Sequence, residues 1–114
     1  MNRITYLLKY RSDRDSLGLV KIPSNVFYGP FTARAIKQYH VTGQTAHPNL
    51  IKSFVMIKRS AAVANMKTKS INRKQGTAIV NACDRILGGK YHDQFVVDMI
   101  NSGAGTAFNM NTNE

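Results

Sequence analysis

Two long runs with helical periodicity, residues 48–68 and 71–87, dominate the middle of the chain. In the first run apolar residues recur at spacings of three and four, which predicts an apolar stripe along one face of a helix. The stripe consists of Leu50, Phe54, Ile57, Ala61 and Ala64. Pro48 suits the first turn of this helix, because the amide that proline lacks would have no partner there. We expect the stripe to be buried.

The second run completes a helical hairpin. Ser70 or Asn72 can cap its start, and Gly88 with Gly89 ends it. The residues expected to point inward are Ala78, Ile79, Ala82, Cys83, Ile86 and Leu87. Two amphipathic helices joined by a short turn bury their apolar faces against each other, so the two runs predict a helix hairpin.

The chain on either side of this hairpin is less regular. Residues 1–31 hold glycines and prolines around short apolar runs, which favours an extended or hairpin arm. Residues 32–39 fit a short helix, FVVDMI (95–100) fits a short strand or a helical turn, and the segment from Gly105 on favours helix. The inward residues of the short helix are expected to be Ala35, Ile36 and Tyr39. The fold class is mainly α: an arm (1–31) and a small helical part (32–114) that together form one domain.

Length and composition narrow the class of protein. A chain of 114 residues is about one domain long. No run approaches the roughly 20 apolar residues that span a bilayer. The start of the chain lacks the long apolar core and cleavage site of a secretory signal, so we expect a cytoplasmic protein. The single cysteine, Cys83, lies among apolar residues and is expected to be buried and unreactive.

The formal net charge of +10 would attract nucleic acid, an anionic membrane or small anions. The basic residues of the middle segment are spread over both long helices and their turn, which favours a solvated face over a binding groove. They are Lys52, Lys58, Arg59, Lys67, Lys69, Arg73 and Lys74. No zinc pattern, aromatic-basic signature or helix-turn-helix accompanies them, so we expect no specific nucleic-acid binding and no membrane binding.

Self-sufficient catalytic constellations are nearly absent. The histidines, at positions 40, 47 and 92, lie far apart with no acid or cysteine at metal-ligand spacing, so no metal site is expected. His92 precedes Asp93. Adjacent side chains point in different directions, which favours a solvated turn over an acid–base pair.

The run SGAGT, residues 102–106, offers anion binding by backbone amides. Its glycines let the main chain approach a ligand, and a helix that starts at Thr106 would direct its free amides to the same point. Thr106 adds a hydroxyl donor, and Asn109 follows one turn later. A glycine-rich helix start capped by Thr106 or Ser102, with no ligand, fits the same residues equally well. The residues alone leave both interpretations open.

Five successive blocks, from about residue 11 to the end, resemble one protein family. They are RSDRDSLGLVKIPSNVFYG, FTARAI, NLIKSFVMIKRSAAVAN, ACDRILGGKYHDQFVVDMINSGAGT and SGAGTAFNMNTNE. In order and spacing they are similar to the N-terminal region of the aspartase/fumarase superfamily. Tyr28–Gly29, Asp93–Gln94–Phe95 and Ala104 resemble the aspartate ammonia-lyase branch rather than the fumarases.

The resemblance implies an activity and a site. The branch eliminates ammonia reversibly from L-aspartate to give fumarate, and no cofactor or metal is expected. Its GAGT threonine lies at the substrate carboxylate and corresponds to Thr106, with Ala104 and Gly105 in the same binding turn. Asn109 lies close behind as a supporting residue.

Family members are several times longer and build each active site from three subunits of a homotetramer. The resemblance therefore implies the N-terminal domain of a larger all-α lyase, truncated within the first substrate-binding segment. We expect the chain to hold no catalytic residue, to be inactive by itself, and to self-associate through surface that the rest of a subunit would cover. Fumarate hydratase or another lyase of the superfamily is an alternative. A small basic nucleic-acid-binding protein is an alternative of a different class.

Overall fold

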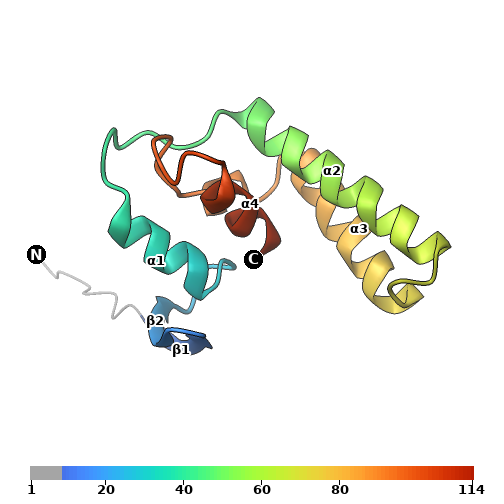
Figure 1. Ribbon diagram of the computed structural model, residues 1–114, viewed down its shortest axis with the longest axis horizontal. Coiled ribbons are helices and arrows are strands. Elements are labelled where there is room, and N and C mark those ends of the chain that lie inside the picture. Colours follow the sequence, from blue (N-terminus) through green and yellow to red (C-terminus); the bar gives the residue numbers. More distant parts are fainter. Residues whose placement is uncertain (1–8) are drawn as a thin grey trace, which may run out of the picture.

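The computed structural model describes residues 9–114, which form a two-stranded hairpin and four α-helices (Figure 1). In chain order the elements are β1 (Tyr10–Asp15), β2 (Gly18–Pro23), α1 (Pro30–Gln38), α2 (Pro48–Lys67), α3 (Arg73–Leu87), a 3-10 turn η1 (His92–Gln94) and α4 (Thr106–Asn113). The mainly α fold with a hairpin arm is confirmed. No helix among these residues is long and apolar enough to cross a membrane.

The arm is an antiparallel hairpin in which Tyr10 lies opposite Pro23 and Asp15 opposite Gly18. Burial alternates along β2, where Val20 and Ile22 are buried and their neighbours are not. Strand side chains point alternately to the two faces, so one face of the hairpin packs against α1 and the other stays in solvent.

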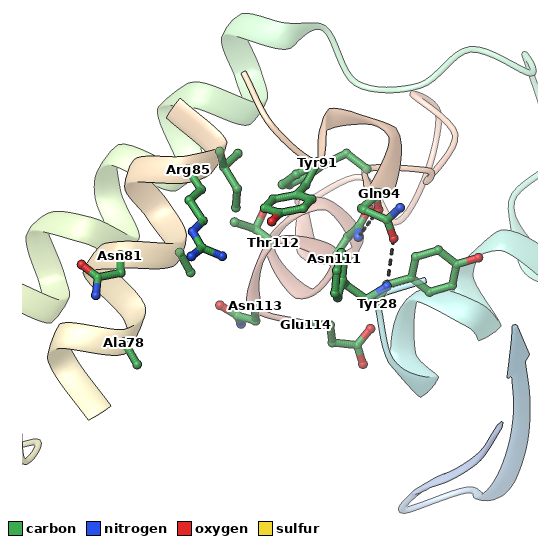
Figure 2. Close-up of a pocket in the computed structure, with 14 residues that line it drawn as sticks. Tyr28, Ala78, Asn81, Arg85, Tyr91, Gln94, Asn111, Thr112, Asn113 and Glu114 are labelled. Carbon is green, nitrogen blue, oxygen red and sulfur yellow. Dashed lines mark hydrogen bonds between the residues drawn. The ribbon is translucent and has the colours of Figure 1, made fainter. Parts of the chain in front are cut away.

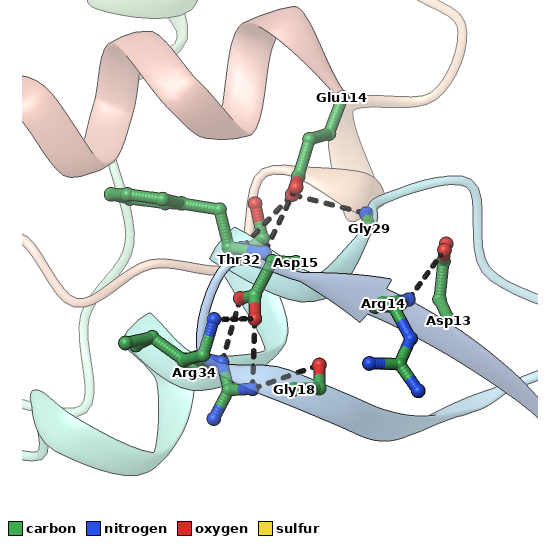
Figure 3. A network of polar contacts seen from close by, with 10 residues as sticks. Asp13, Arg14, Asp15, Gly18, Gly29, Thr32, Arg34 and Glu114 are labelled. Carbon is green, nitrogen blue, oxygen red and sulfur yellow. Dashed lines mark hydrogen bonds and ion pairs between the residues drawn. The ribbon is translucent and has the colours of Figure 1, made fainter.

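Two arginines, Arg34 and Arg11, hold the arm against α1 and against the segment before it, and Figure 3 shows the contact of Arg34. Arg34 of α1 forms an ion pair with Asp15, with 2.7 Å between Nε and Oδ2. The hydrogen bonds from Arg34 hold the pKa of Asp15 below its usual value. Arg11 donates to the carbonyl oxygens of Val26 and Tyr28, at 2.7 and 2.6 Å. These contacts fix where α1 begins.

The expected hairpin of α2 and α3 is present, and both helices start as the sequence indicates. Pro48 opens α2, and Asn72 caps α3 by accepting from Gln75 N at 2.8 Å. The central cluster between the helices and the segment after them consists of Ile51, Val55, Cys83 and Phe95.

The stripe expected to point inward on α2 is wrong by one position. The buried residues of α2 are Ile51, Val55 and Ala62, whereas Ile57 is 64% exposed and Leu50 38% exposed. Of the other residues in that stripe, Ala61 and Ala64 are exposed and Phe54 is half-buried. On α3, Cys83 is buried with Ile86 and Leu87 packed nearby, but Ala78, Ile79 and Ala82 are exposed. Both helices are apolar on more than one face, so periodicity alone does not select the face that packs.

The last helix, α4, lies between α1 and the α2–α3 hairpin (Figure 1). Ala107 of α4 packs with Ala35 of α1 and with Val97, all three buried. The segment FVVDMI, for which strand and helical turn were both open, forms neither. It runs irregularly beneath α4 and makes one isolated bridge, Thr45 to Asp98.

Candidate substrate-binding turn

The turn before α4 has the backbone that its glycines permit. Gly103 and Gly105 have φ of +74° and +75°, a left-handed conformation that costs residues with a side chain more than glycine. Ala104 N donates to Ser102 O at 2.8 Å within this turn. The helix begins at Thr106, as the sequence indicates.

Gly105 occupies the N-cap position of this helix, and the side chain that accepts from a first-turn amide is that of Ser102, not that of Thr106. Ser102 Oγ accepts from Ala107 N at 3.2 Å. The Thr106 side chain is exposed, and its hydroxyl forms no hydrogen bond to any other residue in 9–114. Within the same described range, the amides of Thr106 and Phe108 also lack a partner. The start of α4 therefore leaves one hydroxyl and two amides free to donate.

Asn109 lies one turn after Thr106, and α2 holds its side chain. Asn109 N donates to Gly105 O at 3.0 Å, as expected in a helix. Its side-chain Oδ1 accepts from Lys58 Nζ. Sequence reasoning missed Lys58, because it placed this lysine among the solvated basic residues. No local signal marks it, because its place beside the turn depends on how α2 packs against α4: Phe54, one turn earlier on α2, has its Cζ 4.0 Å from the position that a Cβ on Gly105 would take.

The other basic residues of the middle segment are mostly solvated, as expected. Lys52, Lys67, Lys69, Arg73 and Lys74 are exposed. The second exception is Arg59, whose Nε lies 2.6 Å from Asp84 Oδ1. Lys67, Lys69, Arg73 and Lys74 lie around the α2–α3 turn, whereas Lys52 lies near the start of α2.

Asp98 anchors the segment that leads into the binding turn. Its Oδ2 accepts from the amides of Val41, Thr42 and Gly43 at 3.0, 2.8 and 2.9 Å. Its Oδ1 accepts from Thr42 Oγ1 and Ile100 N, both at 2.9 Å. Burial acts to raise the pKa of Asp98, but the hydrogen bonds from Ile100, Thr42 and Gly43 outweigh it and hold the pKa well below its usual range. An ionised Asp98 therefore ties the 41–43 loop to the chain just before the turn.

Glu114 fixes the opposite end of α4 (Figure 3). Its carboxylate accepts from the amides of Gly29, Phe31 and Thr32 at 3.0, 2.9 and 2.9 Å, at the start of α1. A Cβ at Gly29 would lie 2.9 Å from Glu114 Oε1, so a side chain there would oblige the Glu114 carboxylate to shift. Carboxylates at a helix N-terminus are stabilised by the helix dipole.

The histidines and the cysteine form no reactive pair. His92 Nε2 lies 3.0 Å from Ile86 O, and Asp93 accepts from Gln94 Nε2 and not from His92. Cys83 is buried, and burial raises the pKa of its thiol. Residues 9–114 contain no group of three or more histidine, cysteine or acidic side chains that could hold a metal ion.

A cleft of about 540 Å³ lies between α3, the end of α4 and residues 27–28 (Figure 2). Asn81 and Arg85 border it from α3, and Asn113 and Glu114 border it from α4. None of the binding turn, Ala104 to Thr106, lines this cleft, and neither does Asn109. The cleft and the turn occupy opposite ends of α4, so the candidate site is the turn on the basis of its free donors.

Comparison with known proteins agrees with this arrangement. The protein family described as Lyase matches residues 18–114. The chain belongs to this lyase family, the aspartase/fumarase superfamily. It is 46% identical over 106 residues to the aspartate ammonia-lyase of Bacillus subtilis (strain 168), which covers 93% of this chain and 22% of that protein.

Solved structures share the fold. The fumarate lyase:delta crystallin of Brucella melitensis, in native form, superposes with a TM-score of 0.89 at 39% identity, over 93% of this chain and 25% of that chain. A recombinant class II fumarase from Schistosoma mansoni superposes with a TM-score of 0.90 at 35% identity, over 93% of this chain and 22% of that one. The chain thus spans less than a quarter of the curated relatives' length.

Proposed function

We propose that this chain is the N-terminal domain of an aspartate ammonia-lyase and that its binding turn holds a carboxylate of L-aspartate or fumarate. The observation that carries the proposal is that Ser102, and not Thr106, accepts from the Ala107 amide, so that the Thr106 hydroxyl is free at the start of α4. A carboxylate at this point would accept from that hydroxyl and from free amides, at the positive end of the helix dipole. Ala104 and Gly105 give the ligand access to the backbone, and Asn109, one turn after Thr106, is a supporting residue.

The reaction needs such donors. When a base removes the proton from C3 of aspartate, the carboxylate attached to C3 becomes a doubly charged aci-carboxylate before ammonia leaves from C2. A donor that binds this charge more tightly than the ground-state carboxylate lowers the barrier. Thr106 would be one such donor. The base would come from outside this sequence, so the 114-residue chain is expected to be inactive alone.

The family resemblance of the sequence extends the proposal to the assembly. We expect a cytoplasmic homotetramer in which the arm (1–31) and the helical part (32–114) of each subunit act as one domain. Exposed apolar residues on α2, among them Ile57, would then be covered by other parts of the enzyme.

A segment exchange tests the function. Residues 9–114 replace the aligned segment in the B. subtilis aspartate ammonia-lyase and, in parallel, in the S. mansoni class II fumarase, and fumarate is followed by its ultraviolet absorbance. We expect the first chimera to convert L-aspartate and the second to lose most of its activity towards malate. A folded first chimera with no turnover would contradict the proposal, and activity only in the fumarase host would favour fumarate hydratase.

A further inference from the structure

Helix α2 reaches across to the start of α4 with two side chains one turn apart. Phe54 lies against Gly105, and Lys58 donates from Nζ to Asn109 Oδ1. Lys58 and Asn109 are both half-buried and lie 51 positions apart in the sequence. Unlike the exposed lysines between positions 52 and 74, Lys58 therefore directs its ammonium group towards α4.

The chemistry of the lysine decides how the asparagine is turned. An ammonium group has three donors and no acceptor, so only the carbonyl oxygen of a carboxamide can face it. The two donors on Asn109 Nδ2 must then point away from Lys58. No other residue in the described range accepts from Asn109 Nδ2. Asn109 follows Thr106 by three positions, which places both side chains on the same face of α4.

We propose that Lys58 is a positioning residue that holds the Asn109 carboxamide with its donors towards the substrate carboxylate beside Thr106. The inference rests on the function proposed above. Without the ammonium, the carboxamide can turn over and present Oδ1, a partial negative charge, to the carboxylate. Lys58 would then act on substrate binding through Asn109 and not by touching the substrate.

The orientation is tested on the 114-residue chain itself, by NMR of the Asn109 side-chain amide. We compare Lys58→Met, which keeps the length of the stem and removes the charge, with Lys58→Arg and with Lys52→Met. Lys52 is exposed on the same helix and serves as the control. We expect the Asn109 Nδ2 resonances to shift in Lys58→Met, to return towards their original positions in Lys58→Arg, and to stay unchanged in Lys52→Met. Unchanged Asn109 resonances in a folded Lys58→Met chain would overturn the proposal.

The consequence for binding is tested in the B. subtilis chimera with a double-mutant cycle. Loss of one hydrogen bond to a charged group predicts a KM for aspartate raised roughly tenfold in Lys58→Met, with a smaller change in kcat. In an Asn109→Ala background, the same lysine substitution should leave KM nearly unchanged, because its effect passes through Asn109. Independent, additive effects would refute this route. The NMR result does not depend on activity, so an inactive chimera would count against the proposed function while the orientation of Asn109 is still decided.

Discussion

Substitutions at Thr106 and Ser102 should distinguish a ligand-binding residue, Thr106, from a residue that stabilises the start of α4, Ser102. Thr106→Val removes the hydroxyl and keeps the shape of the side chain, and valine and threonine have similar helix propensities. Since the Thr106 hydroxyl has no partner in residues 9–114, its loss should leave the melting temperature of the 114-residue chain unchanged. Ser102→Ala removes the acceptor of Ala107 N, which is held at 3.2 Å. The loss of such a cap costs about 1 kcal/mol, or about 4 °C in Tm for a domain of this size.

For kcat/KM, in contrast to Tm, the substitution at Thr106 should have the larger effect. A hydroxyl that donates to a substrate carboxylate contributes roughly 1.5–3 kcal/mol, so Thr106→Val in the B. subtilis chimera should lower kcat/KM about 10- to 150-fold. Thr106→Ser keeps the donor and should stay close to the parent. Ser102→Ala should change kcat/KM much less than Thr106→Val does.

Calorimetry of the chain and steady-state kinetics of the chimera measure the two quantities. A lowered Tm with unchanged kcat/KM for Thr106→Val would show that this hydroxyl is structural and would remove it from the site. Equal kinetic losses in Thr106→Val and Ser102→Ala would mean that both act by shaping the turn.

Three further expectations concern stability and association. Gly76→Ala should destabilise the chain by about 1 kcal/mol, because the new Cβ would lie 2.2 Å from Met66 Cγ and this overpacking outweighs the gain in helix propensity. Denaturant titrations measure the effect, with Thr77→Ala on the exposed side as the control. A Gly76→Ala chain more stable than the parent would contradict the packing. Asp98 has a lowered pKa in the folded chain, so its contribution is present above about pH 4, the usual aspartate pKa, and is lost as the pH falls further. In Asp98→Asn, the free energy of unfolding should therefore fall less below about pH 4 than it does in the parent chain and in Asp93→Asn. The same fall with pH in the parent and in both variants would refute this role. The chain should self-associate in sedimentation experiments, and more so at high salt, because salt screens its net charge of +10. Ile57→Ser should reduce the self-association, because Ile57 is exposed on α2. A strict monomer at all concentrations would mean that the exposed face of α2 does not drive association.

The sequence was most informative where one residue determines local geometry. Pro48 and Asn72 mark helix starts and Gly88 a helix end, since capping and proline effects act within one turn. The arm hairpin was foreseeable for the same reason. The choice of buried face on α2 was not, because Ile51 and Ile57 are equally apolar and only the position of α3 decides between them.

The candidate site also has parts that depend on local sequence and parts that depend on long-range packing. The glycine turn and the start of α4 at Thr106 could be predicted from a run of five residues. Two contacts near the turn could not, because each joins segments more than 50 positions apart, Lys58 with Asn109 and Asp98 with the 41–43 loop. Lysine and aspartate are common surface residues, so neither carries a local sign of such a partner.

The contact between Glu114 and the start of α1 sets an order of events during synthesis. The amides of Gly29, Phe31 and Thr32 leave the ribosome long before the residue that accepts from them, 82 to 85 positions later. Until then α1 can form its later turns, but its first turn has only water as a partner. The delay is at least the time needed to synthesise these 82 to 85 residues. A nascent chain one residue short would still lack the acceptor for all three amides.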